Sequence, residues 1–174
     1  MMLASVAMLK ARLGISHDRQ DEQLQRLLEG VSAAIQTFIG CNIETAEYTE
    51  RYNGNGKNRL VLKHYPVKEV RQVKIDGREV ADFDFDNWLL IRHGGFSEGI
   101  RNVGVRYVAG YDEVPADIVE AVLALAMQRL NEIENKGVQS KTLAGETIAF
   151  SNFGQSDGMP PAAFSILNAY KRRV

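Results

Sequence analysis

The hydrophobic pattern of this 174-residue chain changes its period twice, and this change constrains the fold more than any other feature. From Leu24 to Ile39 apolar side chains recur every three or four positions, which predicts an amphipathic helix over residues 18–39. From Glu47 to Tyr111 the period becomes two, and residues 115–135 return to the helical period. A sheet inserted between helices fits this order, so we expect an α+β fold.

Residues that end or begin helices support these boundaries. A short helix is predicted over Ser5–Leu13 with Gly14 after it, and Gly40 follows the long helix, where a left-handed cap is typical. Pro115 suits a first helical position, because its missing N–H is not needed there. The helix that follows is apolar over more than half of its circumference up to Met127, so it should be the most buried one.

The insertion, at about residues 45–111, is predicted to be a small antiparallel sheet. Asn53-Gly54-Asn55-Gly56 and Asp76-Gly77 are typical of turns, because these residue types tolerate positive φ. In Asp82–Asp86 acids alternate with two phenylalanines, which on a strand places solvated acids over two buried rings. A calcium loop would need a glycine and a distal glutamate that are absent here. The candidate strands are Glu47–Tyr52, Arg59–His64, Glu69–Ile75, Trp88–Arg92 and Asn102–Ala109.

The C-terminal part lacks the clear period of the rest. Residues 138–158 are expected to form a mobile loop or a hairpin that orders on contact with something else, with candidate strands Ser140–Leu143 and Glu146–Phe150. The last segment, residues 159–174, is predicted to contain a helix from Ala162 to Arg173. This helix belongs to the same domain or docks on a partner. Residues 1–137 then form a helical bundle that contains the sheet.

Charge alternates along the chain although the net charge is only −1. Residues 1–50 hold four basic and seven acidic residues, residues 51–110 hold eleven and seven, and residues 111–136 hold two and six. This alternation favours self-association, in which acidic and basic faces of neighbouring copies meet. A surface of mixed, solvated charges stays open as the alternative. Non-specific DNA contact would use the basic residues of the sheet, namely Arg59, Lys63, Arg71, Lys74, Arg92 and Arg106.

No pattern in the sequence calls for catalysis, a metal or a cofactor. Gly54–Asn58 contains Gly-Lys without a following hydroxyl and leads into a strand, so it predicts a turn rather than a phosphate loop. His17, His64 and His93 are scattered and unsuited to a zinc site. Cys41 follows a helix C-terminus, where the helix dipole disfavours a thiolate nucleophile. We expect no enzyme, and no membrane association, because no stretch approaches the roughly 20 apolar residues of a spanning helix.

Five strings follow one another in a recognisable order: Ile35-x-x-Phe38-Ile39-Gly40, Tyr48–Gly56, Leu60-Val61-Leu62-Lys63-His64-Tyr65-Pro66-Val67, Val73-Lys74-Ile75-Asp76-Gly77, and Val105–Tyr111 leading into Val114-Pro115-Ala116-Asp117-Ile118. This order resembles the head-tail connector (head-completion, or adaptor) family of long-tailed bacteriophages. The resemblance covers most of residues 5–136, and residues 138–174 match only in general character.

The resemblance implies a structural virion protein at the head-tail interface, made in the host cytoplasm. It implies a ring, typically of twelve copies, that lies beneath the portal, completes the DNA-filled head and provides the platform for tail attachment. The implied partners are the portal protein, further copies of the chain, a tail-side completion protein, and double-stranded DNA that passes non-specifically through the bore. Another tail-completion or neck component, and a non-specific nucleic-acid-binding accessory protein, stay open as alternatives.

The last helix supplies the candidate contacts with the portal or a neighbouring subunit. Its apolar stripe would provide anchors, and its basic end would meet acidic groups of the partner. The alternative is that this helix packs on its own bundle. The candidate contact residues are Phe164, Leu167, Tyr170, Lys171, Arg172 and Arg173.

Overall fold

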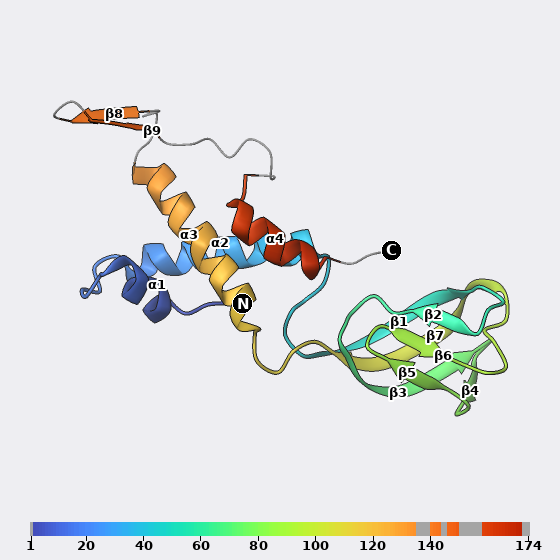
Figure 1. Ribbon diagram of the computed structural model, residues 1–174. Helices are drawn as coiled ribbons and strands as arrows, with labels where there is room; N and C mark the ends of the chain where they lie inside the picture. The colour runs from blue at the N-terminus through green and yellow to red at the C-terminus, as the bar shows by residue number, and fades with distance from the viewer. Residues whose placement is uncertain (1, 135–139, 144–145, 150–157, 172–174) are drawn as a thin grey trace. The chain divides into compact units, whose positions relative to one another are not determined.

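The computed structural model describes residues 2–134, 140–143, 146–149 and 158–171 (Figure 1). It divides into two compact units, a helical unit of Met1–Gly40 with Pro115–Val174, and a sheet unit of Cys41–Val114. The predicted α+β fold is therefore confirmed, with the antiparallel strands of residues 41–114 lying between two helical segments of sequence. Within the described residues, no helix is both long enough and apolar enough to cross a membrane.

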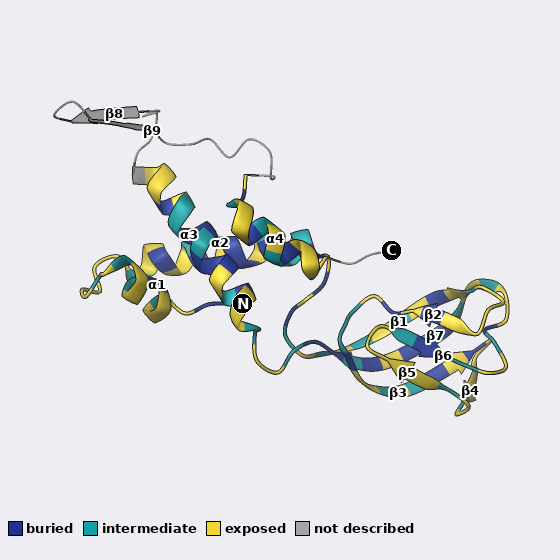
Figure 2. Cartoon of the chain, in the orientation of Figure 1, coloured by how far each residue is buried: buried dark blue, intermediate teal, exposed yellow. Residues whose placement is uncertain are grey.

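The helical unit contains α1 (Val6–Leu13), α2 (Asp21–Ile39), α3 (Ala116–Glu134) and α4 (Pro161–Ala169). α2 and α3 each contact all three of the other helices in this unit. Every helix contributes a fully buried leucine to the core, and Figure 2 shows the buried stretches of α2 and α3. Gly14 and Gly40 end α1 and α2 with left-handed backbones, at φ 70° and 84°. These are the caps that the sequence predicts.

Two helix boundaries differ from the prediction by more than one residue. α2 begins at Asp21 rather than at residue 18, because Asp18 lies in the preceding turn and pairs with Lys10 of α1, at 2.6 Å between the ammonium nitrogen and Oδ1. The same ammonium group lies 2.8 Å from Asp21 Oδ1, so it ties both carboxylates to α1. α4 ends at Ala169, and the predicted end at Arg173 lies outside the described residues.

The sheet unit holds two antiparallel sheets instead of the single sheet that the sequence predicts. The first has the order β1-β7-β3-β4 and the second the order β2-β6-β5. The two sheets share one apolar core, to which Val105 and Tyr107 of β7 and Leu60 and Leu90 of the second sheet contribute. The bounds are β1 (Ala46–Gly54), β2 (Arg59–Val61), β3 (Val67–Ile75), β4 (Arg78–Val80), β5 (Asp84–Asp86), β6 (Leu89–Ile91) and β7 (Gly99–Ala109).

One predicted packing detail is wrong. Of the two phenylalanines in Asp82–Asp86, Phe83 packs against the core, but the Phe85 side chain is 37% exposed. Phe85 pairs with Leu90 across β5 and β6, and so faces the core side of the second sheet. β5 is the edge strand of the second sheet, and the Phe85 ring at this edge stays partly open to solvent.

A two-stranded hairpin follows α3 in the chain. β8 (Ser140–Leu143) pairs in antiparallel fashion with β9 (Glu146–Ala149), and Leu143 lies opposite Glu146. An isolated two-stranded hairpin is marginally stable in water. The ordering of this segment on contact with a partner stays a prediction.

Candidate functional site

Four of the six candidate contact residues, namely Phe164, Leu167, Tyr170 and Lys171, make contacts inside the helical unit. The Leu167 side chain is fully buried, and the Phe164 ring lies against the Phe38 ring of α2, with ring centroids 5.7 Å apart. The Tyr170 hydroxyl lies 2.9 and 2.8 Å from the two carboxylate oxygens of Asp117 on α3. α4 therefore docks on α2 and α3 of its own unit. A contact of these residues with a partner stays a prediction.

The three basic candidate residues, Lys171, Arg172 and Arg173, follow α4 in the chain. Lys171 follows α4, and its ammonium nitrogen lies 4.7 Å from the centroid of the Phe38 ring, at a distance typical of a cation–π contact. Arg172 and Arg173 lie outside the described residues. Lys171 is thus placed at the rim of the contact that holds α4.

The six basic candidates of the sheet unit are divided between its two sheets, with Arg71, Lys74 and Arg106 on β3 and β7 of the first and Arg59, Lys63 and Arg92 on or just after β2 and β6 of the second. Arg71 and Arg106, on neighbouring strands β3 and β7, both bind Glu47 of β1, with guanidinium nitrogens 2.9 and 2.6 Å from Glu47 Oε1. These contacts hold the pKa of Glu47 below its usual value, and the hydrogen bond from Arg106 has the largest influence. In the second sheet Arg92 pairs with Asp82 at 2.9 Å. Much of this positive charge is neutralised within the chain, and non-specific DNA contact stays a prediction.

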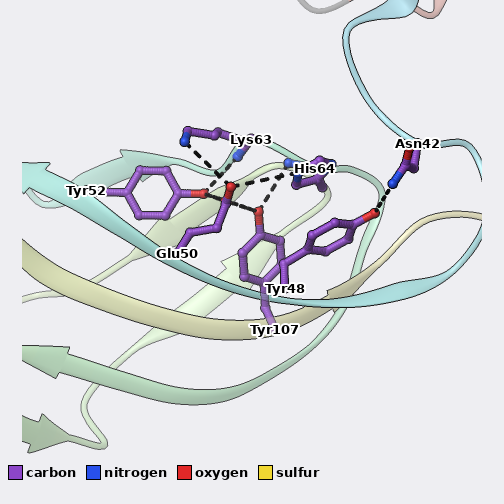
Figure 3. Close-up of polar contacts among 7 residues, drawn as sticks. All are labelled: Asn42, Tyr48, Glu50, Tyr52, Lys63, His64 and Tyr107. Atoms are coloured by element: carbon purple, nitrogen blue, oxygen red, sulfur yellow. Dashed lines mark hydrogen bonds and ion pairs between the residues drawn. The ribbon is translucent and has the colours of Figure 1, made fainter. Parts of the chain in front are cut away.

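A polar network that the sequence analysis missed lies within the sheet unit (Figure 3). The Glu50 carboxylate accepts hydrogen bonds from the hydroxyls of Tyr52 and of Tyr107, the latter at 2.7 Å. The backbone N–H of Lys63 donates to the Tyr52 hydroxyl at 3.0 Å, and that of His64 to the Tyr107 hydroxyl at 3.2 Å. The segment that follows β2 in the second sheet is thereby tied to β1 and β7 of the first.

Lys63 and His64, in the segment that follows β2, also lie near the Glu50 carboxylate. The Lys63 ammonium and the His64 imidazole lie 3.6 and 3.8 Å from Glu50 Oε1. The His64 ring stacks on the Tyr48 ring, with centroids 3.7 Å apart and planes 6° from parallel. Asn42 donates to the Tyr48 hydroxyl at 3.3 Å, which extends the network to the start of the sheet unit.

The protonation states in this network suit a structural role. Burial is the largest influence on Glu50 and raises its pKa, but the hydrogen bonds from Tyr52 and Tyr107 and the charge of Lys63 together bring the pKa below its usual value. Burial and the contact with Glu50 raise the pKa of Tyr52. The carboxylate is therefore a stable anion and the hydroxyls are stable donors. Such an arrangement holds strands together and is poorly suited to moving protons.

A signal for this network was present in the sequence. Tyr48, Glu50 and Tyr52 alternate on β1, so they share one face of the strand, and Tyr107 lies opposite Tyr48 on β7. The face they share is the inner one, because Tyr52 and Tyr107 are buried. The described residues contain no group of three or more His, Cys, Asp or Glu side chains that could hold a metal ion.

Comparison with known proteins finds a matching family and similar solved structures. A family described as head completion protein matches residues 2–173. A chain from the neck of an empty gene transfer agent (GTA) particle computed with C6 symmetry is 19% identical, with a TM-score of 0.59, over 97% of this chain and 90% of that one. A chain from the neck of a native GTA particle computed with C12 symmetry is 18% identical, with a TM-score of 0.59, over 97% and 89%.

A chain from the virion of the native GTA particle is also similar. It is 18% identical, with a TM-score of 0.60, over 97% of this chain and 90% of that chain. No curated protein sequence matches. At these identities the structural matches show a shared fold, and the shared fold extends over nearly the whole chain.

Proposed function

The chain belongs to the head completion protein family, and from this premise we propose that it is a structural neck protein that forms a ring between the portal and the tail of a phage-like particle. The family match over residues 2–173 carries the proposal. The fold that the chain shares with neck chains of particles with sixfold and twelvefold symmetry supports it. The protein then acts in the virion, at the head-tail interface, where it completes the head and gives the tail a platform.

A ring needs two different surfaces on each copy, because a head-to-tail contact closes only when each copy offers a distinct surface to each neighbour. We expect twelve copies, in line with the C12 symmetry of one of the related necks. The work of such a ring is mechanical, and the Glu50 network, with its stable charges, supports a role without catalysis. Double-stranded DNA passes non-specifically through the bore, and a tail-side completion protein binds below.

The contact with the portal is assigned to the basic end of the chain. Tyr170 holds the end of α4 to Asp117, and the Lys171 ammonium lies over the Phe38 ring of the same unit. In the sequence Lys171, Arg172 and Arg173 bring three positive charges together, and no acidic residue follows Asp157. Phe164 is only half-buried and adds an apolar contact, whereas Leu167 serves the core of the helical unit.

The ring is tested by measuring the absolute mass of the purified chain by size-exclusion chromatography with light scattering over a wide concentration range. A discrete closed ring that grows in with concentration is the expected result. A dimer at every concentration would contradict the proposal, because a twofold contact uses the same surface on both copies and leaves none for a ring. A monomer at every concentration is examined further by adding the portal, and a chain that then still binds as scattered monomers contradicts the ring.

The portal contact is tested with a charge reversal at Arg172 and Arg173. The variant Arg172→Glu/Arg173→Glu should bind the purified portal at least roughly tenfold more weakly, while its own ring mass stays unchanged. Arg26→Glu is the matched control, because Arg26 is an exposed basic residue of α2 in the same unit. Equal portal affinity of the three proteins would show that the portal is bound elsewhere.

A further inference from the structure

The sheet unit carries an exposed apolar side chain on a rigid tip at the start of β7. The Ile100 side chain is 86% exposed, more than any other large hydrophobic side chain among the described residues. Its neighbour Arg101 has a φ of 52°, in the left-handed region that non-glycine residues rarely adopt. Such a conformation persists only where the surroundings enforce it, and it often marks a functional contact.

The surroundings do enforce it. The side-chain oxygen of Asn53 accepts the Arg101 backbone N–H at 2.8 Å, and that of Asn102 accepts the Gly54 N–H at 2.9 Å. The Asn102 amide also donates to the Ser97 carbonyl at 2.9 Å. A Cβ atom on Gly54 would lie 1.8 Å from that carbonyl oxygen, so β1 and the loop before β7 approach each other as closely as only glycine allows. Ile100 is therefore presented by a locked backbone.

A protein surface is a better partner for this tip than DNA. Lys57 and Arg101 are the basic residues at the tip, but Glu98 lies against the turn at Gly56 and Asp76 accepts a hydrogen bond from Asn102. The charges thus cancel locally, which is unlike the strongly basic footprint of a DNA-binding surface. A single apolar side chain beside one positive charge fits an apolar patch that has an acidic border.

Such a patch lies on the outer face of the second sheet of the same unit. Leu60 and Leu90 face the core, so the neighbouring row, Val61 opposite Leu89, faces outward. Val61 is 40% exposed, and Leu89 and Ile91 are partly exposed. These three side chains form an apolar row on β2 and β6.

Charges border this row on both sides. Asp86 lies opposite Leu89 and Asp84 opposite Ile91 on the edge strand β5, and Arg59 lies opposite Ile91 on β2. Asp84, Asp86 and Arg101 are all exposed, and none of them forms an ion pair with another described residue. The acidic border therefore offers a partner to an incoming cation, while Arg59 repels it from the opposite side.

We propose that the tip of one copy, Ile100 with Arg101, docks on this outer face of the next copy. Ile100 covers the apolar row of Val61, Leu89 and Ile91, and Arg101 pairs with Asp84 or Asp86. The occupant is a second copy of this chain because both complementary surfaces belong to the sheet unit and neither is satisfied within it. The inference rests on the proposed ring and deepens it, since the contact joins two different surfaces and so repeats from copy to copy.

A disulfide trap tests the contact. The variant Ile100→Cys/Val61→Cys brings two exposed thiols within bonding distance only if the tip of one copy meets the patch of another, because a disulfide needs Cα atoms closer than about 7 Å. Mild oxidation of the full-length variant should give a ladder of dimers, trimers and larger species on a non-reducing gel. The unmodified chain is the control, since its single cysteine, Cys41, is buried.

Each outcome of the trap is decisive. A ladder beyond the dimer supports a head-to-tail contact. Cross-linking that stops at the dimer overturns it, because an isologous pair has then formed. No cross-linking by a chain whose mass shows a ring overturns the contact and leaves the proposed function intact. No cross-linking by a chain that forms no ring, even with the portal, overturns both.

A charge swap tests the same contact without cysteines. Arg101→Glu should weaken self-association roughly tenfold, as should Asp84→Arg/Asp86→Arg, and the combination should recover at least half of the loss on a logarithmic scale. Arg78→Glu, an exposed change on β4, is the control and should change the association less than about twofold. Losses that simply add in the combined variant would overturn the pairing of Arg101 with this acidic border.

Discussion

The two units of this chain are stabilised in different ways. The helical unit buries apolar side chains, and its polar contacts lie at the rim, as with Tyr170 and Asp117. Ser32 is the one polar side chain there that is classed as buried among the described residues, and its hydroxyl accepts the Leu3 N–H at 3.0 Å. The sheet unit instead places the carboxylate of Glu50 among buried tyrosines. Both units therefore have an apolar core, and the sheet unit depends in addition on a specific polar geometry.

The largest effect is expected from a cavity in the helical unit. Leu28 of α2 is fully buried, and Leu28→Ala should lower the free energy of unfolding by about 3 kcal/mol, because the neighbours close such a cavity only in part. The neighbouring Leu27 is only partly buried, so Leu27→Ala is the matched control, with a loss of about 1 kcal/mol. Urea unfolding followed by circular dichroism measures both. Equal losses would contradict an apolar core at Leu28.

A slightly smaller effect is expected from removing the carboxylate of the sheet unit. Glu50→Leu keeps the approximate volume of the side chain but removes the acceptor that the Tyr52 and Tyr107 hydroxyls share. The two hydroxyls lie 3.1 Å apart, so one can still donate to the other while the second is left without an acceptor, at a cost of about 2 kcal/mol. Glu50→Gln retains a carbonyl oxygen and should lose about half as much. Urea unfolding followed by tyrosine fluorescence measures the sheet unit. If Glu50→Leu unfolds like the unmodified chain, the network contributes no stability.

The tyrosine hydroxyls allow a direct comparison of the two units. The Tyr107 hydroxyl is bonded to Glu50 and to the His64 N–H inside the sheet unit, so Tyr107→Phe should cost about 1.5 kcal/mol. The Tyr170 hydroxyl is bonded to Asp117 at the rim, so Tyr170→Phe should cost about 0.5 kcal/mol. Thermal unfolding of the two single variants tests the order. The reverse order would show that the rim contact of α4 matters more than the buried network.

Much of the fold was predictable because the spacing of apolar residues along the sequence indicates which face of a helix or strand is buried. The helical stripe of residues 18–39 is the buried face of α2, and the long strands β1, β3 and β7 follow the period of two. The three-residue strand β4 was missed and β2 was predicted too long, because three residues contain too little of a period to define the ends of a strand. The second sheet depends on pairings between distant segments, and no local pattern specifies these.

The candidate site shows the same limit. The stripe of α4 was predicted correctly as apolar, but whether Leu167 faces its own bundle or a partner depends on what lies opposite it, and α2 and α3 lie there. Glu50 was not singled out from the sequence, although its alternation with Tyr48 and Tyr52 places it on the inner face of β1. The Glu50 carboxylate can lie inside the sheet unit because the Tyr107 hydroxyl donates a hydrogen bond to it, and Tyr107 is 57 residues away in sequence.

Alkaline pH should affect the sheet unit through its tyrosines. The pKa of Tyr52 and that of Tyr107 are raised above the usual value of 10.0, mainly by burial and then by contacts within the network. A raised pKa means that the stabilisation is fully present below pH 10 and is lost as the pH rises beyond it. Between pH 9 and 11, the unmodified chain should therefore lose stability more steeply than Tyr52→Phe/Tyr107→Phe. Parallel pH profiles in urea unfolding would contradict this.

The smallest effect on stability, and a clear effect on binding, is expected at the outer face of the first sheet. Glu47→Gln removes the negative charge that Arg71 and Arg106 share, and all three side chains are at least one-third exposed. The freed guanidinium groups should then contact DNA phosphates, so the slope of log affinity against log salt concentration should steepen by about 1 to 2 for a random duplex.

Glu79→Gln on β4 is the control, because Glu79 accepts a hydrogen bond from Gln72 and pairs with no arginine among the described residues. An unchanged slope would show that neutralisation by Glu47 does not keep this face from DNA. A steeper slope would show that the pairing with Glu47 keeps Arg71 and Arg106 from binding DNA phosphates.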